Sequence, residues 1–166
     1  ASQSTVDNQP IYLTDDGKGY PTLSVSNQWM VASNVNFNAK QIFVVTNIRS
    51  TSDDWMALIS RGGDNAQVRI YSRSTYYDDS KDSFSGGDGL MRVNGTEDRN
   101  FVIGKTHFLS TTLGNTSDYA GHFSDLYIGR DDHNNDHWDG NVYEVIVFDR
   151  ILNSTETSQL EEYLGQ

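Results

Sequence analysis

The segment from Asp131 to Asp139 has the densest supply of metal-ligating side chains in the sequence. Hard cations such as calcium bind roughly six to eight oxygens, which the carboxylates, carboxamides and backbone carbonyls of one turn can supply. The spacing is not that of an EF-hand, because no glycine stands at the sharp turn and no glutamate closes the loop. A hydrated turn of an acidic protein is the alternative. The predicted calcium site has as candidate ligands Asp131, Asp132, Asn134, Asn135, Asp136 and Asp139.

Two histidines, His133 and His137, frame the same segment at a spacing of four residues. On a helix this spacing would place both imidazoles on one face and favour zinc. Asn134 and Asn135 stand between them and indicate a loop instead, so the sequence disfavours zinc here.

A second group of aromatic and acidic side chains occupies Tyr76 to Asp79, and Trp55 follows two aspartates in the same way. Sugars stack their C–H faces on aromatic rings and hydrogen-bond their hydroxyls to Asp, Asn and Arg, so a weak glycan site needs both kinds of group. A lid over the sheet edge is the structural alternative for the tyrosines, and a core position is the alternative for Trp55. The predicted ligand site comprises Trp55, Tyr76, Tyr77, Asp78, Asp79, His133, Asn134, Asp136 and His137, with Arg61, Arg73 and Arg130 as further contacts.

Length and charge limit the possible partners. The chain has 166 residues, which suits a single domain over 1–166 with its own core. Its net charge of −11 argues against nucleic acid and against an anionic membrane surface, because both would repel it. Without cysteine, neither a disulfide nor a thiolate zinc site can form. No apolar run approaches the roughly 20 residues that span a bilayer, so direct membrane insertion is not expected.

The composition also predicts where the chain works. It is acidic, free of cysteine and rich in Asp, Asn, Ser, Thr and Gly, which fits a secreted bacterial module. The sequence begins in polar residues at Ala1, and we expect a module of a longer secreted protein.

The elements that would position these side chains are short apolar runs separated by Gly, Asn, Asp and Ser, a pattern typical of strands and turns. Asn94-Gly95 predicts a tight turn, because glycine tolerates positive φ. The predicted strands are Ile11–Thr14, Thr22–Ser26, Gln28–Ala32, Gln41–Arg49, Met56–Arg61, Val68–Arg73, Leu90–Val93, Asn100–Ile103, His107–Thr112, Asp125–Ile128 and Val142–Asp149.

Two of these strands have informative patterns. Val142–Asp149 is apolar on both faces apart from Glu144, which predicts a strand in the middle of a covered sheet. Gln41–Arg49 alternates, and its two predicted faces are Ile42, Val44, Thr46 and Ile48 on one side and Phe43, Val45 and Asn47 on the other.

One helix is predicted at the C-terminus, over Asn153–Leu164. Asn153 can cap it, and Glu156 can return the bond in a capping box. The apolar stripe expected to pack on the sheets is Leu160, Tyr163 and Leu164. Many short strands followed by one helix predict an all-β fold, a two-sheet antiparallel sandwich with Greek-key or jelly-roll connections.

The C-terminal part carries several motifs in a fixed order, namely Leu126-Tyr-Ile-Gly-Arg130, Trp138-Asp-Gly140, a long strand ending at Asp149-Arg150, and a capped helix from Ser154. This order resembles the signature of bacterial concanavalin A-like, laminin G-like domains, in which an aromatic-x-Gly turn precedes the long strand. The N-terminal segment is similar through Gln9-Pro10-x-Tyr12 and Gly19-x-Pro21-x-Leu23. The resemblance implies a concanavalin A-like jelly-roll sandwich over nearly the whole chain. This fold serves lectins, glycan hydrolases, lyases, adhesion modules and spacers alike.

The sequence lacks the catalytic patterns of this fold. Sugar-cleaving members carry paired acids as Glu-x-Asp-x-Glu on one strand, and no such pattern occurs here. Glu144 and Asp149 are five positions apart and would lie on opposite faces of their strand. No Gly-x-Ser-x-Gly elbow and no cysteine nucleophile is present. We therefore expect that the chain is not an enzyme.

The function expected from these observations is a lectin-like, non-catalytic glycan-binding module of a bacterial surface adhesin or polysaccharide-processing protein, assisted by calcium. A highly anionic polysaccharide is a poor partner for a domain of charge −11. The alternative is a structural or protein-interaction module without sugar binding, and a polysaccharide-cleaving enzyme is the least favoured reading.

Overall fold

Short apolar runs form antiparallel strands along the chain, as the sequence predicts. The computed structural model describes residues 1–50, 56–61, 69–72, 91–97, 101–113, 122–130 and 137–165. Within these ranges the elements are η1 Val6–Asn8, β1 Ile11–Leu13, β2 Thr22–Ser26, β3 Met30–Ala32, β4 Phe37–Asn38, β5 Gln41–Ile48, β6 Met56–Arg61, β7 Arg69–Ser72, β8 Met91–Val93, β9 Thr106–Thr112, β10 His122–Phe123, β11 Leu126–Ile128, β12 Asp139–Phe148 and α1 Ser154–Leu164.

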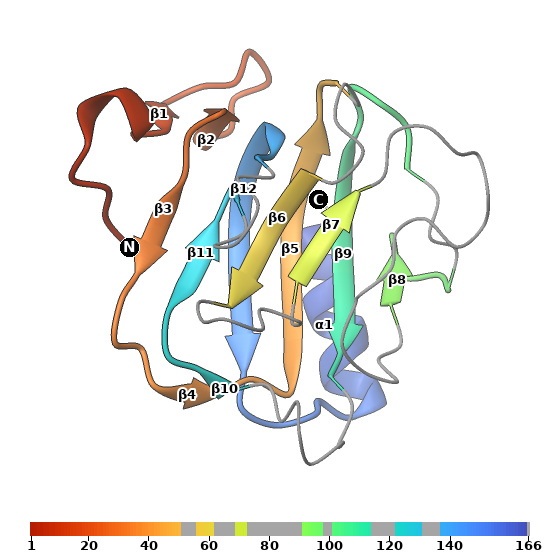
Figure 1. Cartoon of the computed structure of the whole chain (residues 1–166). Helices are drawn as coiled ribbons and strands as arrows, with labels where there is room; N and C mark the ends of the chain where they lie inside the picture. Colours follow the sequence, from red (N-terminus) through yellow and green to blue (C-terminus); the bar gives the residue numbers. More distant parts are fainter. Residues whose placement is uncertain are drawn as a thin grey trace.

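The described strands form two main antiparallel sheets. The large sheet has the order β1-β2-β12-β5-β9-β8, the small sheet has the order β3-β11-β6-β7, and β10 pairs separately with β4. Figure 1 shows the small sheet in front of the large sheet, and α1 behind the large sheet. The prediction of an all-β, β-sandwich protein with a short C-terminal helix is therefore confirmed.

The core lies between the two sheets. From β5, Ile42 and Val44 are fully buried there, together with Leu58 and Ile59 of β6. Phe43 points to the other side of β5, where its ring packs edge-on against Phe148 at a centroid distance of 5.9 Å. The predicted alternation of β5 is thus confirmed. We call the side of the large sheet that faces α1 its outer face (Figure 1).

Strand β12 lies between β2 and β5, which confirms its predicted place inside a sheet. It begins at Asp139, earlier than the predicted start at Val142. Its pairing with β5 shifts between Val142 and Glu144, so Tyr143 is an extra residue in the ladder. Such a β-bulge bends the strand and changes the direction of neighbouring side chains.

Polar side chains hold the backbone groups next to this bulge. The Thr46 hydroxyl donates to the Asn141 carbonyl at 2.7 Å, and the Thr22 hydroxyl donates to the Val142 carbonyl at 3.1 Å. The Asn141 N–H donates to Oδ1 of Asn47 at 2.9 Å. Buried backbone groups need partners, and here three buried polar side chains of the neighbouring strands supply them.

Two sequence predictions are wrong, one about residues 101–103 and one about Gly140. Residues 101–103 of the predicted strand Asn100–Ile103 are not extended in a sheet but lead into a turn, where Gly104 has a φ of +78° and Lys105 N–H donates to Val102 O at 3.0 Å. Gly140 is not in a turn before the strand but within β12. It packs so closely on the Asn47 carbonyl that a Cβ would collide with it.

The C-terminal helix begins as predicted. Asn153 Oδ1 accepts from Glu156 N–H at 3.0 Å, and Glu156 Oε2 accepts from Asn153 N–H at 2.9 Å, which confirms the capping box. Hydrogen bonds from Arg150 and from the Asn153 backbone lower the pKa of Glu156 to about 2. The predicted stripe packs only in part, because Leu160 and Leu164 are half-buried but Tyr163 is 60% exposed. Among the described residues, no helix combines the length and apolarity that crossing a membrane requires.

We predict that Thr46→Val lowers the free energy of unfolding by about 1–3 kcal/mol, because it removes a buried hydrogen bond at almost constant volume. Thr111→Val is the matched control. Thr111 is 1% exposed, like Thr46 at 3%, but its hydroxyl makes no hydrogen bond within the described part of the chain. This control should leave stability unchanged or raise it in urea unfolding. Equal losses for both variants would contradict the role assigned to Thr46.

Candidate functional site

Most of the predicted site residues lie outside the described residues. This applies to Trp55, Tyr76, Tyr77, Asp78, Asp79, Asp131, Asp132, His133, Asn134, Asn135 and Asp136, and to Arg73. The glycan and calcium sites that we assign to these loops remain predictions. His137 and Asp139 are described, and so is Arg130.

Asp139 and Arg130 are both engaged within the fold. Oδ1 of Asp139 accepts from Arg49 Nε at 3.2 Å and from Arg49 Nη2 at 3.1 Å. The Arg130 guanidinium lies 4.1 Å from the ring centroid of Trp29, an arrangement that holds it by a cation–π interaction. His137 forms isolated backbone bridges with Ala57 and Arg130. Within the residues that the structure describes, no three His, Asp or Glu side chains are grouped to hold a metal ion.

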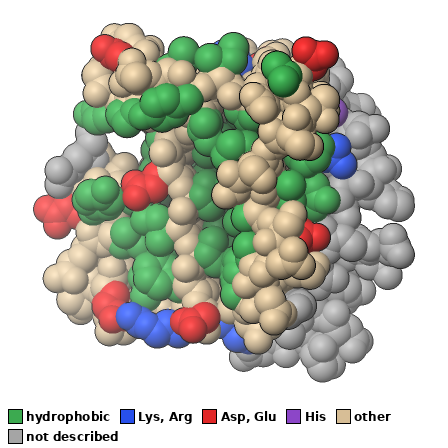
Figure 2. Space-filling view, turned by 90° about the vertical axis from the view of Figure 1, so that its left-hand side faces the viewer, with side chains coloured by type: hydrophobic (Ala, Val, Ile, Leu, Met, Phe, Trp, Pro, Cys, Tyr) green, Lys and Arg blue, Asp and Glu red, His purple; other side chains and the backbone are tan. Residues whose placement is uncertain are grey.

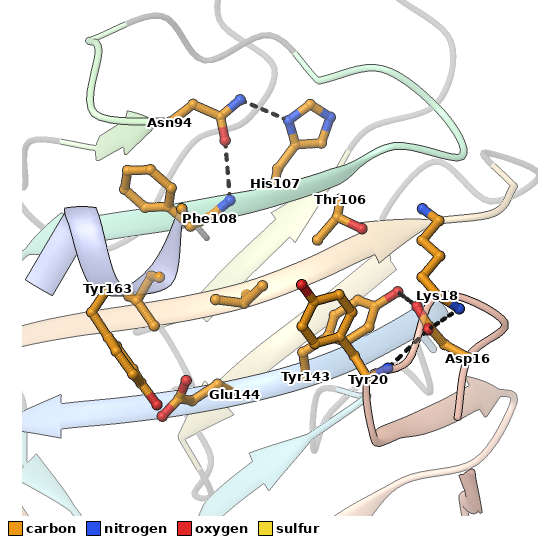
Figure 3. A pocket seen from close by; sticks show the side chains of 13 residues that line it. Asp16, Lys18, Tyr20, Asn94, Thr106, His107, Phe108, Tyr143, Glu144 and Tyr163 are labelled. Atoms are coloured by element: carbon orange, nitrogen blue, oxygen red, sulfur yellow. Dashed lines mark hydrogen bonds between the residues drawn. The ribbon is translucent and has the colours of Figure 1, made fainter. Parts of the chain in front are cut away.

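A pocket of about 770 Å³ opens on the outer face of the large sheet. Figure 3 shows Asp16, Lys18 and Tyr20 of the β1–β2 hairpin on one side and Tyr163 of α1 on the other. We call this the outer pocket, and its lining residues are Asp16, Lys18, Tyr20, Val45, Asn94, Thr106, His107, Phe108, Tyr143, Glu144, Tyr163, Leu164 and Gly165.

The floor of the outer pocket comes from three adjacent strands. Val45 of β5 is paired with Phe108 of β9 and with Glu144 of β12, so these three side chains share the outer face. In a regular strand the neighbour of Glu144 would point into the core. Because of the bulge, Tyr143 also lines the outer pocket, and β12 contributes two consecutive residues.

The β1–β2 hairpin is closed by two aspartates. Oδ1 of Asp15 accepts from the N–H groups of Gly17 and Gly19, both at 2.7 Å. These glycines have φ values of +89° and +93°, which residues other than glycine rarely adopt. Oδ1 of Asp16 accepts from Lys18 N–H at 2.8 Å. The loop that carries Tyr20 is therefore fixed by its own sequence.

Asp16 also fastens the hairpin to the sheet. The Tyr143 hydroxyl donates to Oδ2 of Asp16 at 2.9 Å, and Asn47 Nδ2 donates to the same hydroxyl at 3.2 Å. Partial burial raises the pKa of Asp16, but the hydrogen bonds from Lys18, Tyr143 and Tyr20 together outweigh it and hold the pKa below its usual 3.8. Asp16 is thus an ionised acceptor at neutral pH.

His107 forms the back of the outer pocket. It is only 8% exposed. Its Nε2 accepts from Val102 N–H at 2.9 Å, and the side-chain amide of Asn94 lies 3.0 Å from Nδ1. Asn94 is held in turn by the Phe108 N–H, which donates to its Oδ1 at 3.1 Å. The imidazole therefore supports the pocket wall and is not presented to a ligand as a base.

Aromatic rings border the outer pocket on two sides. Tyr20 is 52% exposed and Tyr163 is 60% exposed. The half-buried rings of Phe108 and Tyr143 and the carboxylate of Glu144 also line the outer pocket. The outer pocket thus offers apolar ring faces beside hydrogen-bond acceptors. This combination suits a small organic ligand that has both hydroxyl or amine groups and apolar C–H surfaces.

No protein-family model, curated protein or solved structure is similar enough to count as a match. The fold and the outer pocket therefore carry the functional argument.

Our sequence reasoning did not identify the outer pocket. One local signal was present, since Asp15-Asp16-Gly17-x-Gly19 is typical of a tight, Asx-stabilised turn that presents Tyr20. The sequence shows Glu144 as the polar residue of an apolar strand, but not that it lines a pocket. Tyr163 was assigned to the buried stripe of the helix, whereas it borders the pocket.

We predict that Tyr143→Phe raises the pKa of Asp16, because the carboxylate loses the hydroxyl that favours its charged form. A lowered pKa stabilises the fold above the usual value of 3.8, and this contribution disappears as the pH falls through the lowered value. The stability difference between wild type and variant should therefore shrink below that pH. NMR titration of the Asp16 carboxyl carbon measures the pKa. Tyr12→Phe, at a 64% exposed tyrosine outside the pocket, is the control and should not shift it.

Proposed function

We propose that the chain is a non-catalytic glycan-binding module with a concanavalin A-like jelly-roll sandwich, and that the outer pocket binds a saccharide. The observation that carries this proposal is a pocket of about 770 Å³ bordered by tyrosines and containing ionised or polar acceptors. The two-sheet fold with its C-terminal helix is compatible with that family. The motifs from Leu126 to Leu164 support the same assignment.

The chemistry of the outer pocket suits sugar rings. A pyranose has C–H faces that stack on rings such as those of Tyr20 and Tyr163, and its equatorial hydroxyls need fixed acceptors and donors. Glu144 offers such an acceptor on the pocket floor. The site is open and partly polar, which favours moderate affinity for part of a polymer over enclosure of a small molecule.

A binding role accounts for the acids better than catalysis does. Of the two carboxylates that line the outer pocket, Asp16 accepts three hydrogen bonds and has a lowered pKa, so it is a poor proton donor. His107 is enclosed by its partners and cannot replace it as a general acid. Glycoside hydrolysis needs both a proton donor and a second carboxylate.

The setting that we propose is the bacterial cell surface or the secreted fraction, in an adhesin or a polysaccharide-processing protein. The composition supports this, since the chain has no cysteine and a net charge of −11. Calcium bound by the segment 131–139 would assist by stabilising the folded state.

A protein-interaction module is the second candidate, and one observation favours it. Figure 2 shows apolar side chains exposed on the face that carries η1, β1 and β3. Val6, Ile11 and Tyr12 are each more than half exposed, and β1 is an edge strand of the large sheet. Exposed apolar edges are surfaces on which other chains can pair.

We predict that a glycan array identifies at least one bound saccharide and that Tyr20→Ala weakens its binding about tenfold, the size of one lost aromatic contact. Tyr12→Ala is the control, because Tyr12 is an exposed tyrosine outside the outer pocket. An array without any bound glycan, with calcium and with chelator, would favour the interaction module. If Tyr76→Ala, Tyr77→Ala or Asn134→Ala weakens binding and Tyr20→Ala does not, the saccharide binds at the predicted loops instead.

We also predict that millimolar calcium raises the melting temperature and that a chelator lowers it. A site that binds the folded state stabilises it by about 3 kcal/mol when free calcium is about a hundredfold above its dissociation constant. Differential scanning calorimetry measures the shift, and Asp136→Asn should reduce it. An identical melting temperature in calcium and in chelator would contradict the calcium site.

A further inference from the structure

The ionisable side chains of the outer pocket differ in how many hydrogen bonds they already make with the protein. Asp16 accepts hydrogen bonds from Lys18 N–H, Tyr20 N–H and the Tyr143 hydroxyl. Both ring nitrogens of His107 are hydrogen-bonded, Nδ1 with the Asn94 amide and Nε2 with the Val102 N–H. Glu144 is half-buried, yet it makes no hydrogen bond or ion pair within the described ranges. It is therefore the pocket carboxylate with unused capacity to accept from a ligand.

The surroundings of Glu144 are aromatic and aliphatic. Figure 3 shows it between Tyr163 and Tyr143 on the pocket floor, and Val45 is its partner across the strands. Lys18 is the one Lys or Arg among the lining residues that the structure describes, and it is exposed on the hairpin, where its charge acts on Asp16. Within the part of the chain that the structure describes, this half-buried carboxylate beside ring faces thus has no counter-ion.

We propose that the outer pocket selects saccharides that carry a free, protonated amine, with Glu144 as the counter-ion. This inference rests on the proposed function and names the class of sugar. An ammonium group would donate charge-assisted hydrogen bonds to Glu144, which are stronger than those from a neutral hydroxyl. The rings of Tyr163 and Tyr143 favour a cation in the same position. An N-acetylated amine lacks the charge and adds bulk, so it gains neither interaction.

The overall charge of the protein agrees with this choice of ligand. A net charge of −11 attracts a cationic oligosaccharide and speeds its encounter with the surface. The same long-range attraction would act on any polyamine, so the test must separate it from recognition in the outer pocket.

The test compares two probes by isothermal titration calorimetry, the fully deacetylated β-1,4-linked glucosamine trimer and its fully N-acetylated counterpart. It uses the whole chain at mildly acidic pH, where the sugar amine is protonated. The deacetylated trimer should bind about tenfold more tightly than the acetylated one. Glu144→Gln should abolish this preference, and Lys18→Gln should strengthen binding of the cationic probe.

Asp149→Asn is the charge-matched control, because Asp149 follows β12, is exposed and does not line the outer pocket. It should leave the preference unchanged. An equal loss in Asp149→Asn and Glu144→Gln would show bulk attraction and overturn the inference. Equal affinities for the two trimers, both weakened by Tyr20→Ala, would overturn the amine selectivity but leave glycan binding intact. Binding of no glycan at all, on the array or in the calorimeter, would overturn the proposed function itself.

Discussion

The shift in pairing between β12 and β5 at Tyr143 determines what the outer pocket contains. Without it, Tyr143 and Glu144 would point to opposite faces, and one of them would enter the core. An irregular ladder inside a sheet leaves backbone groups that water cannot reach. Thr22, Thr46 and Asn47 hydrogen-bond to those groups, so these three buried polar side chains support the bulge. Asn47 also donates to the Tyr143 hydroxyl and so links the bulge to the pocket.

The outer pocket joins elements that are far apart in the sequence, and each is fixed independently. The hairpin is closed by its own aspartates and tied to the sheet through Asp16. The helix starts at its capping box, and Glu161 near its end lies 3.7 Å from Arg92 of β8. A wall built on such fixed elements loses little conformational entropy when a ligand binds, so more of the free energy of its contacts contributes to affinity and selectivity.

The sequence predicted the strands well, because a period of two residues is visible without knowing the partners. It predicted the helix start because Asn153 and Glu156 form a local motif. It could not predict the bulge at Tyr143, which exists only relative to the register of β5. It was wrong at residues 101–103, where apolar residues precede a glycine turn and stay outside the sheets. The outer pocket was missed because its residues come from separate elements, and no local pattern records which elements become neighbours.

We propose that the outer pocket, which is built around the bulge, binds a saccharide. The most direct measurement is amide chemical-shift mapping by NMR, with a saccharide found on the glycan array titrated into the labelled chain. Binding in the outer pocket should place the largest shifts on residues 16–20, 106–108, 143–144 and 163–165. Shifts confined to the small sheet, with these residues unchanged at saturation, would contradict it.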